Sequence, residues 1–230
     1  MKHAIKWTSV ALAVAMGNGL IAAQASAGEG FVEGASADLT SRTFYFNRDF
    51  RNDNQGQSKA EETAQGFIMN FESGFTEGPI GFGADVTALM GLKLDSSRSR
   101  TGTDLLPTRS NGKAPSNYSH IRGAAKMQIL EDTEVRYGTH FVDNPVIAYD
   151  DTRLLPSHYF GYSASNTSID GLFVEAGRMT HRSDMNASGQ QSDVFADGNK
   201  RVTYLGGSYE FAPNLAASLY TSDVKDLWRR

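Results

Sequence analysis

Charged side chains recur at alternate positions in several segments of this 230-residue sequence. Arg122 and Lys126, for example, are four residues apart, so on an extended strand both project from the same face. The residues placed in this way on the polar face of a predicted strand are Arg42, Asp85, Lys93, Arg122, Lys126, Glu134 and Arg136. A guanidinium holds a carboxylate through two parallel hydrogen bonds. The pattern therefore favours non-covalent handling of small charged molecules, with Arg42, Arg122 and Lys126 as the first candidates.

A second cluster lies in the polar stretch "DNPVIAYDDTRLLPSHYF". Arg153 can bind a carboxylate, or it can tie this stretch to its surroundings by pairing with Asp150 or Asp151. The two aspartates can favour a partner with an amino or guanidino group, or form a solvated turn. Tyr149 and Tyr159 can line a binding region or serve only as packing residues.

Motifs for catalysis are lacking in the sequence. It contains no nucleophile elbow, HExxH, phosphate-binding loop or complete glycine-rich dinucleotide fingerprint, and its histidines show no metal-ligand spacing. We therefore predict no enzyme, no cofactor and no metal site.

The stretch "FGADVTALMGLKLD", residues 82–95, shows what positions the charged residues. Apolar and polar residues alternate along it, which predicts a strand with one apolar and one polar face. As a strand it would extend about 45 Å, more than twice the usual length in globular proteins. The apolar face therefore contacts either a protein core or lipid.

Nine segments show such alternation, which predicts an all-β protein. The segments 158–168 and 171–182 do not keep one clean alternation. The predicted strands cover residues 35–46, 64–75, 80–95, 118–130, 133–142, 158–168, 171–182, 200–211 and 215–226.

The lengths of the connections between the predicted strands indicate whether the apolar face contacts a protein core or lipid. Those at 76–79, 131–132, 169–170 and 212–214 are short, whereas 47–63, 96–117, 143–157 and 183–199 are long and polar, and the two kinds alternate strictly. Short turns at one end and long loops at the other are typical of outer-membrane β-barrels. We therefore predict that the apolar face contacts lipid and that the polar face lines a lumen. Aromatic residues near strand ends, among them Tyr137 and Phe141, suit the interface girdles of such a barrel.

Residues 1–27 read as a secretory signal peptide. Lys2 and Lys6 precede an apolar run, and "ASA" at 25–27 is a small-residue cleavage site. This places residues 28–230 in the barrel. The net charge of −4 does not indicate the excess of basic residues that is typical of nucleic-acid-binding proteins. The sequence contains no cysteine, so it cannot form disulfide bonds.

Bacterial single-chain barrels have an even number of strands, because both termini lie in the periplasm. Nine strands therefore predict that this sequence is the N-terminal part of a longer barrel, or that one strand is miscounted.

Several ordered stretches resemble the OprD-type family of substrate-specific outer-membrane porins. They include "RTFYFNRDFR" (42–51), "TGTDLLP" (101–107), "DTRLLPSHYFG" (151–161) and "IDGLFVEAGR" (169–178). The resemblance implies half of an 18-stranded barrel, often loosely trimeric, that lets small carboxylate-containing molecules diffuse inward. It implies amino acids, organic acids and carbapenem antibiotics as solute classes, and a second half that carries most of the basic residues lining the pore.

The resemblance also implies roles for the loop residues. In relatives the third long loop folds into the lumen, and the arginine of "RLLP", here Arg153, faces the constriction and binds the substrate carboxylate. Asp150, Asp151, Tyr149 and Tyr159 then belong to the constriction. Two other interpretations stay open: a non-transporting structural or adhesive outer-membrane barrel, and a soluble periplasmic β-sandwich.

Overall fold

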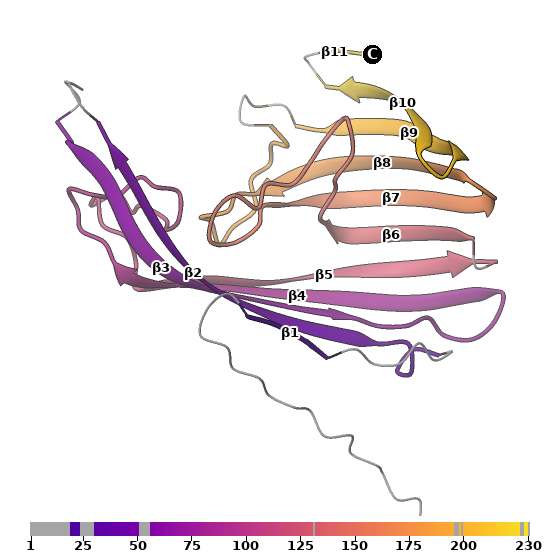
Figure 1. Ribbon diagram of the computed structural model, residues 1–230, viewed down its shortest axis with the longest axis horizontal. Coiled ribbons are helices and arrows are strands. Elements are labelled where there is room, and N and C mark those ends of the chain that lie inside the picture. Colours follow the sequence, from indigo (N-terminus) through magenta and orange to yellow (C-terminus); the bar gives the residue numbers. More distant parts are fainter. Residues whose placement is uncertain are drawn as a thin grey trace, which may run out of the picture.

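The computed structural model describes residues 30–50, 56–130, 132–195, 198 and 200–225, together with the backbone of 19–23 and 228–229. These residues form one antiparallel sheet in which the strands lie side by side in sequence order (Figure 1). The strands are β1 (Gly19–Ala23), β2 (Ser36–Asp49), β3 (Lys59–Glu72), β4 (Ile80–Asp95), β5 (Asn117–Ile129), β6 (Thr133–His140), β7 (His158–Ile169), β8 (Leu172–Ser183), β9 (Val202–Ala212), β10 (Leu215–Val224) and β11 (Trp228–Arg229).

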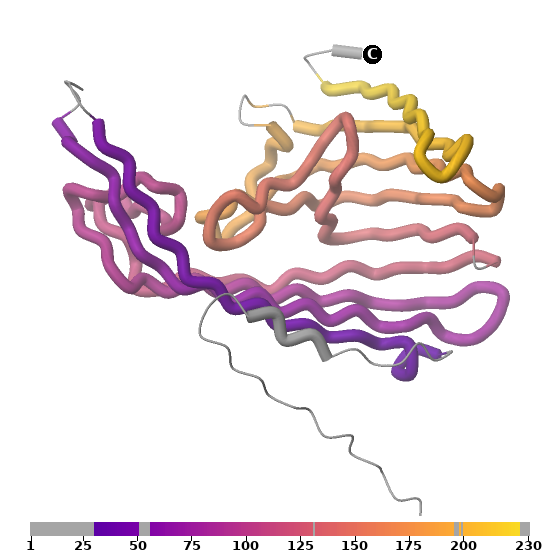
Figure 2. The backbone as a smooth tube through the Cα atoms, in the orientation of Figure 1, coloured from indigo at the N-terminus to yellow at the C-terminus, as the bar shows by residue number. Residues whose placement is uncertain are grey.

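The nine predicted strands are confirmed as β2 to β10. Each pairs with its sequence neighbour, as in Ile80↔Ile129 between β4 and β5. Short turns lie at one end of the sheet and long loops at the other, and the sheet is open and curved (Figures 1 and 2). The strand β1 lies inside the predicted signal peptide; most of that segment is outside the described residues, and its removal stays a prediction.

The two faces of the sheet differ as the alternation predicts. Phe82, Ile121 and Tyr137 on the outer face are 56%, 70% and 59% exposed. On the inner face, Ala64, Asp85 and Lys126 are buried. Leucines of two long loops cover Ala64, whereas Asp85 and Lys126 form an ion pair with each other. Among the described residues, no helix is long and apolar enough to span a membrane.

The first long loop is shorter than predicted. We expected a connection over 47–63, but β2 runs to Asp49 and β3 begins at Lys59, with Asn47 opposite Glu61 and Asp49 opposite Lys59. These polar strand ends carry no apolar alternation, so their pairing left no signal in the sequence. A cross-strand hydrogen bond supports the extension, since the Tyr45 hydroxyl on β2 donates to Glu61 on β3 at 3.1 Å. Within β3, Lys59 forms an ion pair with the same Glu61.

Leucines from two long loops build a core against the inner wall. Leu105, Leu106, Leu154 and Leu155 are at most 1% exposed and pack with residues of β3 and β4 such as Ile68. Loops that carry buried leucines are held in place, because removing these side chains from water favours the packed arrangement.

We expect Leu155→Ala to lower the free energy of unfolding by about 2–5 kcal/mol, because the truncation leaves a cavity in this core. Urea unfolding followed by tryptophan fluorescence measures the change. The matched control is Leu219→Ala, since Leu219 on β10 is 84% exposed. Equal losses in the two variants would contradict the packed-loop description.

Candidate functional site

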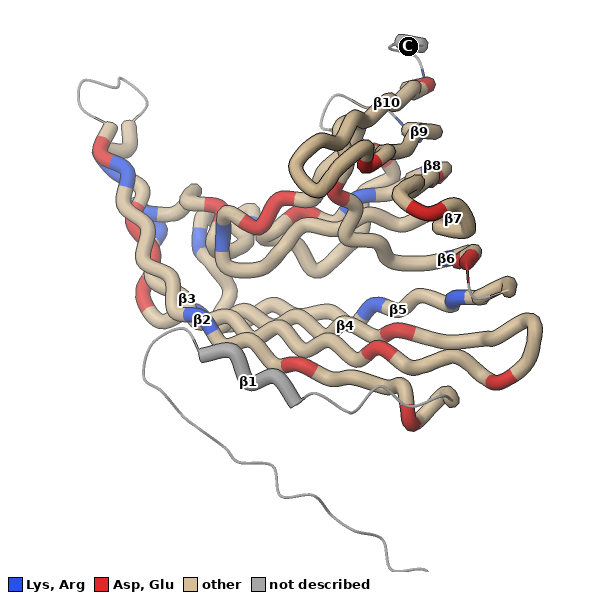
Figure 3. The backbone as a smooth tube through the Cα atoms, turned by 45° about the vertical axis from the view of Figure 1, so that its right-hand side comes forward, with Lys and Arg blue, Asp and Glu red and all other residues tan. Residues whose placement is uncertain are grey.

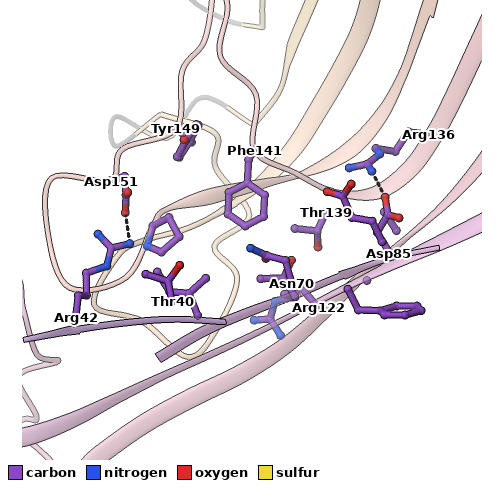
Figure 4. Close-up of a pocket in the computed structure, with 17 residues that line it drawn as sticks. Thr40, Arg42, Asn70, Asp85, Arg122, Arg136, Thr139, Phe141, Tyr149 and Asp151 are labelled. Carbon is purple, nitrogen blue, oxygen red and sulfur yellow. Dashed lines mark hydrogen bonds and ion pairs between the residues drawn. The ribbon is translucent and has the colours of Figure 1, made fainter. Parts of the chain in front are cut away.

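A hollow of about 510 Å³ lies on the inner face of the sheet, beneath the loop of residues 141–157 (Figure 4). Strands β2 to β6 form its wall, and the loop supplies Phe141, Tyr149, Asp151 and Pro156. Of the residues predicted from sequence, Arg42, Asp85, Arg122, Arg136, Tyr149 and Asp151 line this hollow. Charged residues of both signs occur along this part of the sheet and its loops (Figure 3).

Arg42 and Asp151 close one side of the hollow (Figure 4). Arg42 Nη2 lies 2.7 Å from Asp151 Oδ1, and Arg42 Nη1 donates to the carbonyl oxygen of Arg153 at 3.3 Å. The guanidinium of β2 is therefore paired with a carboxylate of the loop, which neutralises much of its charge and ties the loop to the wall.

Asp85 on β4 neutralises two cations. Lys126 Nζ on β5 lies 2.8 Å from Asp85 Oδ1. Arg136 on β6 pairs with Asp85 Oδ2 (Figure 4). Arg136 is also 3.6 Å from the Glu134 carboxylate, and the Lys126 ammonium lies 5.0 Å from the centroid of the Phe75 ring. Both cations therefore have partners inside the protein.

Arg122 on β5 differs from these cations in its hydrogen-bond partners. Its guanidinium donates to two backbone carbonyl oxygens, those of Ile121 at 3.2 Å and Ser188 at 2.9 Å. Within the described part of the chain it has no carboxylate partner. Of the three arginines that line the hollow, Arg122 alone keeps an uncompensated charge there, again within the residues that the structure describes.

Three further predicted residues, Asp150 and Arg153 of the loop and Tyr159 of β7, do not line the hollow. Arg153 Nε donates to the carbonyl oxygen of Thr103 at 3.1 Å, and the guanidinium lies 4.7 Å from the centroid of the Phe46 ring. The hydroxyl of Tyr159 is buried against the Ala148 carbonyl at 2.9 Å. Hydrogen bonds from Thr152 hold the pKa of Asp150 below its usual value. Arg153 as a carboxylate ligand stays a prediction.

The other three wall candidates, Lys126, Glu134 and Lys93, do not line the hollow either. Lys93 lies near the end of β4. Its Nζ donates to the carbonyl oxygen of Ala114 at 3.0 Å, so it holds the end of the loop 96–116.

Several residues of the hollow were not predicted from the sequence. Thr40, Asn70, Thr87 and Thr139 add hydroxyl and amide groups to its wall. Alternation would have placed Asn70 beside Glu72 on the polar face of its strand, so a signal was present. Phe141 was expected in an outer aromatic girdle; this is corrected, because β6 ends at His140 and the Phe141 side chain lines the hollow.

No group of three or more metal-ligating side chains occurs among the residues that the structure describes. The rings of His120 and His158 have centroids 5.0 Å apart and are tilted by 40° to each other, and both residues are buried.

Long strands with an apolar outer face, short turns at one end and a charged hollow under an infolded loop define the wall of an outer-membrane porin. The comparison with family models agrees: residues 29–230 match the outer membrane porins of the OprD family. The chain belongs to this family.

Individual relatives support this assignment. Porin D of Pseudomonas aeruginosa is 35% identical over 237 residues, covering 98% of this chain and 52% of Porin D. A BenF-like porin from Pseudomonas fluorescens Pf-5 superposes with a TM-score of 0.81 at 36% identity, over 86% of this chain and 52% of that one. OpdK of Pseudomonas aeruginosa, solved with vanillate, gives a TM-score of 0.77 at 34% identity, over 86% and 51%. The chain thus spans about half the length of these relatives.

Proposed function

We propose that the protein containing this chain lets small carboxylate-bearing solutes diffuse passively across the outer membrane, with Arg122 as their main cationic contact on this half of the wall. The observation that carries the proposal is the uncompensated guanidinium of Arg122 in a hollow where Arg42 and Arg136 are paired with carboxylates. Charged side chains lining a pore select ions by their sign.

The neighbouring groups suit such a solute. Thr40, Asn70 and Thr87 can hydrogen-bond to the uncharged parts of a small molecule. OpdK, a relative, was solved with vanillate, which is itself a carboxylate. The solute classes to compare are those that the family resemblance implies, namely amino acids, organic acids and carbapenems.

The test uses the protein as the cell produces it, purified from outer membranes and inserted into planar lipid bilayers. We expect ion conductance and a reversal potential, measured across a gradient of a sodium carboxylate, that shows a high relative permeability of the carboxylate. A protein that inserts and never conducts would contradict the proposal and favour the structural or adhesive barrel. Cross-linking in the same membranes measures whether the protein is the loose homotrimer that the family resemblance implies.

A further inference from the structure

Two long loops carry the same short motif, Thr-x-Leu-Leu-Pro. It occurs as "TDLLP" at 103–107 and as "TRLLP" at 152–156. The leucine pairs of both copies are buried in one cluster against β3 and β4. The two loops are therefore packed against each other and against the wall at equivalent points of their sequences.

A buried carboxylate on β3 holds the first copy. Glu62 is fully buried and accepts hydrogen bonds from the Ser96 hydroxyl at 2.6 Å, the Thr103 hydroxyl at 2.5 Å and the Thr103 backbone N–H at 3.3 Å. No cation pairs with Glu62 in the described residues. Burying a carboxylate is costly unless hydrogen bonds satisfy it, so these donors are fixed in place by the charge that they surround.

The second copy is held by the first. Arg153 Nε donates to the Thr103 carbonyl oxygen at 3.1 Å, and the carbonyl oxygen of Arg153 accepts from Arg42 at the hollow. Arg42 in turn pairs with Asp151 at 2.7 Å. An unbroken path of polar contacts therefore leads from Glu62 in the wall, through Thr103 and Arg153, to the ion pair that borders the hollow.

We propose that Glu62, Thr103 and Arg153 are positioning residues that fix the loop 141–157 and so set the width and the ion selectivity of the hollow. The proposal rests on the proposed function, because a fixed hollow matters to selectivity only if solutes pass through it. Arg153 acts here through Thr103 and Arg42. The buried leucines keep the loop on the wall, and loss of any member of the path loosens the part of the loop that holds Asp151 against Arg42.

Three variants break the path at different points in the protein purified from outer membranes: Glu62→Gln, Thr103→Val and Arg153→Met. Thr103→Ser is the matched control, because it keeps the hydroxyl that Thr103→Val removes, while both variants retain the backbone N–H. In planar bilayers we expect the three variants to show increased current noise and at least a threefold change in the carboxylate-to-sodium permeability ratio, whereas Thr103→Ser conducts like the wild type. Because the residues act along one path, Thr103→Val combined with Arg153→Met should change the ratio no more than either alone.

Digestion with proteinase K in intact outer membranes measures the loop without any need for conductance. We expect the loop 141–157 to be cut several times faster in Thr103→Val and Arg153→Met than in the wild type and Thr103→Ser. Wild-type rates in these variants, or wild-type noise and selectivity in a conducting Thr103→Val channel, would overturn the proposal. Absence of conductance in the wild type together with faster cutting in the variants would instead reject the proposed function and keep the positioning role.

Discussion

Replacing Arg122 with Gln should lower the permeability of the pore to a carboxylate, relative to a cation of similar size, about five- to tenfold. A hydrogen bond to a charged group contributes about 1.5–3 kcal/mol, and solvent in an open lumen reduces this contribution. The effect should be large for Arg122 because no carboxylate among the described residues already compensates its charge. Reversal potentials in planar bilayers, measured across a gradient of a sodium carboxylate, give the ratio directly.

The control for this variant is Arg109→Gln, which makes the same change of charge on an exposed residue of the loop 96–116. We expect its permeability ratio to stay within a factor of two of the wild type, because surface charges are screened by salt. If Arg109→Gln matched Arg122→Gln, the selectivity would arise from the overall charge of the protein, and the role of Arg122 would be rejected.

Replacing Asp85 with Asn should destabilise the protein and at the same time make the pore more selective for anions. Asp85 and Lys126 have side chains only 10% and 8% exposed, and Asp85 pairs with both Lys126 and Arg136. Removing one partner of a buried ion pair leaves an uncompensated charge, which costs about 3–5 kcal/mol. Urea unfolding measures the loss, and bilayer recordings measure the gain in anion selectivity that follows from two released cations.

Asp95→Asn is the matched control for stability. Asp95 pairs with Arg100 at 3.1 Å, but its side chain is 56% exposed. Exposed ion pairs contribute about 0–1 kcal/mol, so this variant should unfold close to the wild type. An Asp85→Asn protein as stable as Asp95→Asn would show that the cluster around Asp85 is hydrated and does not hold β4, β5 and β6 together.

Most of the fold could be predicted from the sequence because its signals are local. Alternation along residues 80–95 marked β4 with its observed bounds, and the lengths of the connections separated the two ends of the sheet. The alternation was weakest in β7 and β8, and the structure gives the reason. The register between these strands shifts at Phe160/Gly161 and again at Asn166/Ile169, so the residues that share a face change along the strands.

The candidate site was only partly predictable, because a side chain on the polar face of a strand has several possible partners. The alternation placed Arg42, Lys126 and Arg122 on that face and gave no reason to prefer one of them as a ligand. The structure pairs Arg42 with Asp151 and Lys126 with Asp85, and it leaves Arg122 to backbone carbonyls. Glu62 was missed altogether, since it lay in an expected loop and its importance depends on the buried Thr103.

The sequence by itself determined the two-faced strands, the alternation of short turns and long loops, and the family to which the chain belongs. Each of these follows from neighbouring residues or from ordered stretches of sequence. Only the tertiary structure decided which cation remains uncompensated and what holds the loops. Arg42 and Asp151 are 109 residues apart in the chain, and Glu62 and Thr103 are 41 apart. Such contacts depend on how the loops fold back over the sheet, which no local pattern specifies.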